Sequence, residues 1–287
     1  MANTILQDRK YASPGRCIYC GCTSKPLTDE HIIPFSLSGY LVLEDASCPT
    51  CQAETSKFET AVAKSLEHFR ARYGVRARNP TRRKKAYLFD AVDSAGNPTR
   101  VSIPIGEIPA TGMLYKFGRA NILEGRPPFD PRFEWLPVPF SDDDDLKLAI
   151  EKHGWNTEMR FKMVVEEYAR MLAKIGHSYA VAELGLDAFT PLCLDIILGR
   201  TKNFGYVVGG SFDLKPVPDS TSDHYLGLGM IKELNKPVLL VVVLRLFQQM
   251  RGSPSYHIIV GKPQTGAQFA AVEKYFSDGK AMSGHGI

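Results

Sequence analysis

The spacing of hydrophobic residues predicts one long helix and several strands in the C-terminal half of the chain. Apolar residues recur at close to 3.6-residue intervals over residues 156–184, and Gly185 stands where such a helix would end. A shorter helical piece is predicted over 191–198. Three runs of apolar residues are typical of strands, and the last two predict a hairpin: 206–208, 238–247 and 256–260.

The N-terminal part of the chain carries shorter elements. The pattern predicts a tight turn at 17–21, a strand through 31–33 that Pro34 ends, and a brief strand at 41–43. A helix is expected to start at Ser47 or Pro49 and to run to about Arg72. Its apolar face would carry Phe58, Val62, Leu66 and Phe69.

The middle of the chain has weaker signals. Residues 86–92 and 99–105 predict a hairpin around a turn rich in small and polar residues, and a loop-rich stretch with many prolines follows up to Phe140. The acidic run 142–145 is expected to cap a helix that starts at Leu146.

A change in composition suggests a domain boundary after the first helix. Basic residues accumulate there with no acidic residue among them: Arg70, Arg72, Arg76, Arg78, Arg82, Arg83, Lys84 and Lys85. We therefore predict an α+β protein with an N-terminal module over 1–75 and a mixed α+β C-terminal domain over 76–287. No motif gives the second domain a chemical role, so target selection and regulation are both open.

Composition limits the class of protein. The chain has 287 residues, 44% of them hydrophobic and 23% charged, with a net charge of +4, which is ordinary for a globular protein. The longest apolar run, 238–244, is far shorter than the roughly 20 residues that span a bilayer. Because residues 1–10 also lack the hydrophobic stretch of a signal peptide, we expect a cytoplasmic protein with no membrane partner.

The cysteines give the strongest chemical signal. Five of the six lie between positions 17 and 51, and four of them form two C-x-x-C pairs: Cys17, Cys20, Cys48 and Cys51. Four paired thiolates satisfy tetrahedral zinc and leave no open position, so the spacing predicts a structural zinc site. The alternative is four unrelated buried cysteines. Cys22 and Cys193 have no partner at this spacing. We expect Cys22 to take no part in the metal site and Cys193 to lie in the hydrophobic core.

The segment between the two cysteine pairs contains the run D-E-H-I-I-P at 29–34. Together with the C-x-x-C pairs, a glycine-containing loop and the later T-S-K-F-E at 55–59, it resembles the four-cysteine branch of the HNH endonuclease family. The resemblance covers Cys17 to about Glu59. It implies a ββα-metal module in which His31 activates water and Glu30 holds a catalytic Mg²⁺ or another divalent cation beside the structural zinc.

Chemistry supports these roles independently of the resemblance. Hydrolysis of a phosphodiester needs a base that is largely neutral near pH 7, which suits His31, and a carboxylate such as Glu30 is a suitable ligand for a hard cation. Where the family has asparagine or histidine on the helix, this chain has Gln52 and Ser56. By that resemblance Gln52 would join Glu30 in holding the catalytic cation, with Ser56 as a further candidate ligand. Glu59 lies seven residues after Gln52 on nearly the same helical face and could replace a missing ligand.

The sequence thus predicts a metal-dependent endonuclease acting on nucleic acid, DNA rather than RNA, with the basic segment contacting phosphates. The first alternative is a nucleic-acid-binding regulator that has lost cleavage because of Gln52 and Ser56. The second is a C-terminal domain that binds a small ligand or a partner, with the zinc module as an adaptor. Whether the protein forms a homodimer is left open.

Overall fold

The largest sheet lies in the C-terminal half and has six strands in the computed structural model, which describes residues 8–24, 26–75, 84–93, 95–130, 132–141, 147, 151, 164–210, 223–250, 252–280 and 285–286. Its strands run in the order β13-β10-β11-β12-β8, and β9 pairs with β12 as well. Pairing is antiparallel throughout. The strands are β8 (Thr190–Pro191), β9 (Val208–Gly210), β10 (Tyr225–Ile231), β11 (Leu239–Arg245), β12 (Ser255–Lys262) and β13 (His285–Gly286).

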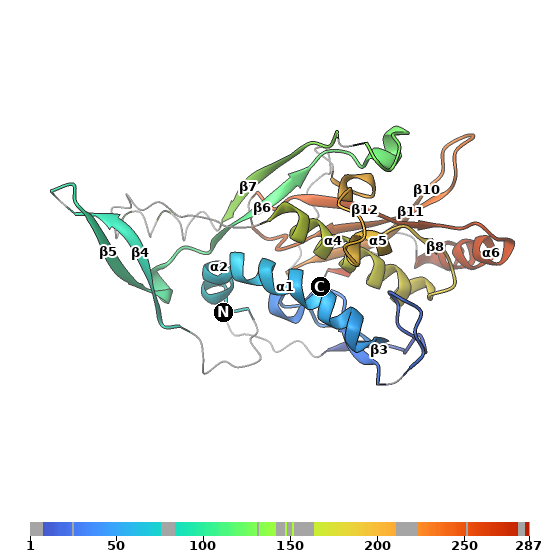
Figure 1. Cartoon of the computed structure of the whole chain (residues 1–287), viewed down its shortest axis with the longest axis horizontal. Coiled ribbons are helices and arrows are strands. Elements are labelled where there is room, and N and C mark those ends of the chain that lie inside the picture. The colour runs from blue at the N-terminus through green and yellow to red at the C-terminus, as the bar shows by residue number, and fades with distance from the viewer. Residues whose placement is uncertain are drawn as a thin grey trace.

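Helix α4 (Val165–Leu184) packs against this sheet, and the short α5 (Leu194–Ile197) and α6 (Gly266–Tyr275) lie beside it (Figure 1). Residues 171–181 of α4 are buried without interruption, which indicates a helix covered on all sides. The approach to the sheet is close: a Cβ atom built on Gly176 would lie 2.8 Å from the Ile258 side chain. A glycine therefore allows α4 to approach the sheet at this point.

The N-terminal part forms a small three-stranded sheet followed by two helices. Strand β3 (Leu41–Ser47) is central, with β1 (Arg9–Tyr11) parallel on one side and β2 (Thr28–His31) antiparallel on the other. Helix α1 (Pro49–Ser65) follows at once and packs on α4. Helix α2 (Glu67–Arg72) continues it after a break at Leu66.

Two further hairpins lie in the chain between α2 and α4. Strands β4 (Ala86–Val92) and β5 (Pro98–Pro104) form an arm that projects from one end of the molecule (Figure 1). Strands β6 (Thr111–Phe117) and β7 (Trp135–Ser141) pair closer to the body. Short 3₁₀ helices cover Phe35–Leu37, Ile105–Glu107, Asn121–Glu124 and Phe204–Tyr206, and a π-helical turn covers Phe276–Lys280.

The structure bears out the predicted α+β class. The β4–β5 and β11–β12 hairpins are confirmed within a residue or two, and so is the end of the long helix at Gly185. Phe58, Val62, Leu66 and Phe69 are buried as predicted. The first eight residues of the predicted long helix and the acidic run 142–145 lie outside the described residues.

Several predicted boundaries are wrong. The strand expected over 31–33 ends at His31 and starts at Thr28, because the chain bends at Ile32 and enters a 3₁₀ turn after Pro34. The single helix expected to Arg72 is broken at Leu66, whose backbone leaves helical values at φ −101° and ψ 19°. The strand expected at 206–208 lies at Val208–Gly210, and only four residues of the piece at 191–198 are helical.

One hydrophobic core extends across the predicted domain boundary. It contains Ile32 and Phe58 from the N-terminal segment together with Leu172 and Ile258 from the C-terminal half. A smaller cluster lies at the base of the β4–β5 arm. The division into 1–75 and 76–287 remains a prediction, and the shared core indicates that the two segments stabilise each other.

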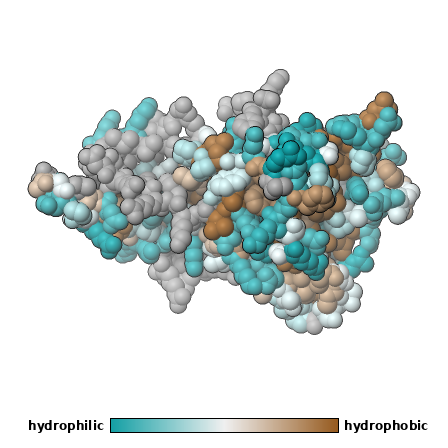
Figure 2. All heavy atoms as spheres, turned by 45° about the horizontal axis from the view of Figure 1, so that its top comes forward, coloured by the Kyte–Doolittle hydropathy of each residue, from teal (hydrophilic) through white to brown (hydrophobic). Residues whose placement is uncertain are grey.

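On the face drawn in Figure 2, hydrophilic and hydrophobic residues are interspersed. Among the helices of the described residues, none is both long and apolar enough to cross a membrane.

Candidate functional site

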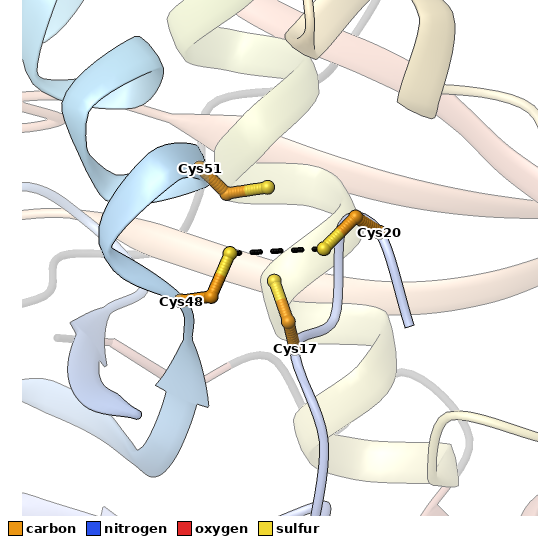
Figure 3. A group of neighbouring side chains, drawn as sticks. All are labelled: Cys17, Cys20, Cys48 and Cys51. Atoms are coloured by element: carbon orange, nitrogen blue, oxygen red, sulfur yellow. Dashed lines mark hydrogen bonds between the residues drawn. The ribbon is translucent and has the colours of Figure 1, made fainter. Parts of the chain in front are cut away.

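The four paired cysteines converge at one point. Cys17 and Cys20 come from the turn before β2, and Cys48 and Cys51 come from the start of α1 (Figure 3). Their sulfur atoms all lie within 4.8 Å of one another, and Cys20 Sγ is 3.7 Å from Cys48 Sγ. All six cysteines of the chain are free thiols. The sequence prediction that these four form one cluster is confirmed.

The local backbone explains why the sulfurs meet. In the first pair, the N–H of Cys17 donates to the Cys22 carbonyl at 2.8 Å and the N–H of Gly21 donates to the Cys17 carbonyl at 2.9 Å. Gly21 has φ +75°, a left-handed value that glycine adopts without strain. In the second pair Cys48 is the residue before the first turn of α1, and Pro49 starts the helix.

The arrangement fits zinc. A tetrahedral ion with Zn–S bonds of about 2.3 Å places its sulfurs about 3.8 Å apart, close to the 3.7 Å between Cys20 and Cys48, and all four sulfurs lie within 4.8 Å of one another. Burial opposes ionisation of Cys48, but the backbone amide of Cys51 and the neighbouring thiols lower the pKa of Cys48 to about 7. Burial raises the pKa of Cys20 and Cys51, so a metal ion bound by all four sulfurs would displace the protons of these two thiols.

Glu30, the predicted ligand of the catalytic cation, is held by a lysine that the sequence analysis did not single out. Lys174 of α4 places Nζ 2.5 Å from Glu30 Oε1 and 2.8 Å from Glu59 Oε1. The same ammonium donates to the carbonyl of His31 and, at 3.3 Å, to that of Ile32. Glu30 and Glu59 are therefore brought together around an ammonium group.

This charge cluster is buried, since the Lys174 side chain is 1% exposed and the Glu30 side chain 7%. Burial by itself lowers the pKa of Lys174, but the two carboxylates outweigh that effect and raise it above its usual value. Lys174 is thus a permanent cation at neutral pH, and it joins β2 and α1 to α4.

Two more side chains of α4 reach the zinc module. His177 Nε2 lies 2.9 Å from the Ile18 carbonyl, and Ser178 Oγ lies 3.2 Å from the Tyr19 hydroxyl. With Lys174 they form an i, i+3, i+4 set, which is one face of a helix. Burial lowers the pKa of His177 to about 4, so this imidazole is neutral near pH 7. These contacts anchor the turn that carries the first cysteine pair.

The sequence offered one signal for these residues. Lys174, His177 and Ser178 are polar residues at helical spacing inside the otherwise apolar stretch 171–182, and such residues are rarely buried without partners. Their partners could not be inferred, because they lie 115 or more positions away.

His31, the predicted base, is the last residue of β2 and is partly exposed. Its ring meets the Phe35 ring edge-on at a centroid distance of 5.6 Å. Neighbouring residues of a strand point to opposite faces, so the burial of Glu30 against α4 accords with a His31 side chain nearer the surface. Gln52 is partly exposed and Ser56 is exposed on α1.

The residues present do not fit a catalytic divalent cation in this arrangement. Glu30 and Glu59 already neutralise Lys174. Across the parts of the chain that the structure describes, only the four cysteines form a group of three or more Cys, His, Asp or Glu side chains close enough to share an ion. We therefore derive no chemical step through a magnesium ion held by Glu30 or Glu59.

The predicted phosphate-contacting residues divide into three groups. Arg70 donates to the backbone carbonyls of Ser36 and Ala63, and Arg72 donates to that of Ile108, so both contribute to the fold. Lys84 forms an exposed ion pair with Glu67 at 2.9 Å, and Lys85 is exposed. Arg76, Arg78, Arg82 and Arg83 lie outside the described residues. A contact between this segment and nucleic acid remains a prediction.

His224 is a buried histidine whose hydrogen bonds specify its neutral form. Its Nδ1 accepts from the N–H of Phe247 at 3.1 Å, and its Nε2 lies 2.7 Å from the Leu37 carbonyl and must donate to it. A second proton on Nδ1 would break the first bond. Burial lowers the pKa of His224, with Asp223 opposing the shift.

We expect this histidine to make the protein acid-sensitive. Because its pKa is lowered in the folded state, the unfolded chain takes up the proton first, and stability is lost as the pH falls through the ordinary histidine value of about 6.5. The loss is at most about 1.4 kcal/mol per pH unit for one proton. The free energy of unfolding in urea from pH 8 to pH 5.5 should fall more steeply for the wild type than for His224→Asn. Parallel slopes would contradict the assignment.

A groove with a volume of about 470 Å³ runs beside the first cysteine pair. It is lined on one side by Cys17–Gly21 and on the other by the loop before β8, and Arg16 and Asp187 form an ion pair within its lining. Cys20 is exposed. One edge of the zinc site is therefore accessible to solvent.

Comparisons with known proteins leave the family open. Searches of protein-family models, curated proteins and solved structures find no match to this chain. The functional conclusion therefore depends on the residues and geometry described above.

Proposed function

We propose that this protein is a zinc-stabilised endonuclease of the HNH type, which hydrolyses phosphodiester bonds in nucleic acid and uses His31 as the general base. The observation that carries the proposal is the placement of His31. It ends β2, which pairs with β3, and β3 leads directly into α1 next to the four-cysteine cluster. Two antiparallel strands followed by a helix are the order that the sequence resemblance implies.

The environment of His31 supports a role as a base. The side chain is partly exposed, so a substrate can approach it, while its backbone is held at the carbonyl by Lys174 and through pairing with Val42. A histidine takes a proton from water most effectively when its orientation is fixed by its surroundings. Zinc has a structural role here, because four thiolates leave it no open position for water or phosphate.

A second candidate function is favoured by one specific observation. Lys174 occupies the space between the two carboxylates that would hold a catalytic cation, and Gln52 and Ser56 replace the helix residues of the family. A zinc module that binds nucleic acid without cutting it is consistent with that charge arrangement. It would retain the fold and the salt-dependent binding but not cleavage.

We expect His31→Ala to lower the rate of DNA cleavage about 10²–10⁴-fold, since this is the usual contribution of a general base. Plasmid and single-stranded DNA should be tested with magnesium, with manganese and without added divalent cation. The matched control is His257→Ala, which removes another partly buried histidine, on β12.

Both variants must first match the wild type in zinc content and melting temperature. Equal cleavage by wild type and His31→Ala would contradict the role of His31. Salt-sensitive DNA binding with no cleavage by the zinc-loaded wild type under any of these conditions would replace the endonuclease proposal with the second candidate.

A further inference from the structure

The surroundings of Lys174 have the composition of a cation site. Four oxygens face its ammonium group, two from the carboxylates of Glu30 and Glu59 and two from the backbone carbonyls of His31 and Ile32. Carboxylate and carbonyl oxygens are the ligands that hard cations such as Ca²⁺ take in proteins. We refer to these four groups as the oxygen cage.

The dimensions and charge of the oxygen cage also resemble those of a cation site. The Nζ atom lies 2.5 Å from Glu30, 2.8 Å from Glu59 and 3.3 Å from the Ile32 carbonyl, so a Ca²⁺ ion in its place would require the last two oxygens to move inward to about 2.3–2.6 Å. Two carboxylates face one ammonium, which leaves one negative charge uncompensated within the cage. A divalent cation in place of the ammonium would balance the charge.

Of the two carboxylates of the cage, Glu59 is the more exposed. An ammonium has three N–H donors, and four oxygens surround this one. Glu59 Oε1 lies at ion-pair distance but has no hydrogen bond of acceptable geometry. The Glu59 side chain is 23% exposed, but its Oε1 atom is itself buried, so the cage lies near the surface at Glu59 without opening to solvent there.

We propose that the oxygen cage is a cation-binding site whose occupant is the protein's own Lys174 ammonium. A tethered cation at this place links β2 and α1 to α4 and closes the cage to divalent ions. Removing the ammonium opens a site for a hard divalent cation. The proposal goes beyond the proposed function, because cation binding in the cage does not depend on whether the protein cuts nucleic acid.

The test is the effect of Ca²⁺ on the melting temperature of zinc-loaded wild type and Lys174→Ala. Calcium is the appropriate probe because thiolate sites select soft metals, so it does not compete with zinc for the cysteines. Lys174→Ala should melt well below the wild type, since two buried carboxylates lose their counter-charge. Millimolar Ca²⁺ should restore much of that loss and bind with 1:1 stoichiometry in calorimetry, while wild type should not respond.

Three further variants make the result specific. Lys236→Ala removes a lysine from an exposed ion pair with Glu233 and should behave like the wild type in Ca²⁺. Lys174→Ala/Glu59→Gln lacks one cage carboxylate and should lose at least tenfold in calcium affinity. Lys174→Gln keeps a polar side chain that can bond the two carbonyls, and it serves as the test variant should Lys174→Ala not fold.

Two results would overturn the proposal. One is a folded Lys174→Ala or Lys174→Gln variant with no calorimetric Ca²⁺ binding and no rise in melting temperature. The other is a wild type that binds Ca²⁺ and loses the binding on Glu59→Gln, because the cage would then accept a divalent ion beside Lys174. Cleavage assays play no part in either result, so failure of this proposal is distinguishable from failure of the endonuclease proposal.

Discussion

Removal of zinc is expected to unfold the segment from Cys17 to Arg72 and to lower the melting temperature of the whole chain. Structural zinc contributes an apparent binding free energy of roughly 10–16 kcal/mol in small zinc modules, which is comparable to the total stability of a typical domain. The effect should extend beyond the cysteines, because Ile32 and Phe58 share one hydrophobic core with α4 and β12.

The measurement is zinc stoichiometry together with thermal unfolding, before and after chelation. Cys51→Ser should bind less than one zinc per chain and melt far below the wild type, since it removes one of four converging thiols. Cys22→Ser is the matched control, because Cys22 lies beside the first pair but outside the cluster, where its sulfur accepts a bond from the Ser24 N–H at 3.3 Å. One tightly held zinc in Cys51→Ser would refute the four-thiolate site.

The sequence predicted those parts of the fold whose signals are local. The β11–β12 hairpin follows from two dense apolar runs, and the four-cysteine cluster follows from two C-x-x-C spacings, which are typical of metal knuckles. The four-cysteine cluster was therefore predictable residue by residue, although the two pairs are separated by a strand, a 3₁₀ turn and another strand.

The missed strands have physical reasons. Pro137 and Pro139 lie within β7, opposite Tyr115 and Met113 of β6, and proline in a sequence argues against a strand except at a sheet edge. This two-stranded sheet consists only of edges, so proline is tolerated there. β10 was missed because Gly227 and Gly229 interrupt its apolar pattern.

Helix α6 was missed although its start carries a recognisable signal. Thr265 accepts a bond from the Gln268 N–H at 3.3 Å, and the Gln268 side chain accepts from the Gln264 N–H, an arrangement close to a capping box. The T-x-x-Q spacing was present in the sequence. Attention to caps, in addition to apolar periodicity, would have predicted this helix.

The charge balance of the candidate site could not be predicted from the sequence. Glu30, His31 and Glu59 were named from a local motif, but the ammonium that joins them belongs to a helix 115 or more positions away in the chain. Only tertiary packing brings Lys174 to them. A motif can thus identify the residues of a site while the surrounding fold decides whether they are available to a metal.

Gly39→Ala is expected to disrupt the loop that follows His31 and to destabilise the protein by roughly 3 kcal/mol or more, at the upper end of the cost of overpacking. A Cβ atom on Gly39 would lie 1.8 Å from the Ile33 carbonyl oxygen and 2.6 Å from the Ile33 carbonyl carbon. Both are backbone atoms, so no rotation of a side chain can relieve the overlap. The chain must shift at Ile33, next to the Ile32 carbonyl that contacts Lys174.

The matched control is Gly106→Ala, because a Cβ atom there meets nothing within 4 Å. Chemical unfolding should show a large loss for Gly39→Ala and a change within about 0.5 kcal/mol for Gly106→Ala, the usual range for exposed sites. Since the displaced backbone at Ile33 adjoins the Ile32 carbonyl of the oxygen cage, Lys174→Ala combined with Gly39→Ala should destabilise the protein by less than the sum of the two single changes. Strict additivity would show that the loop and the cage are independent.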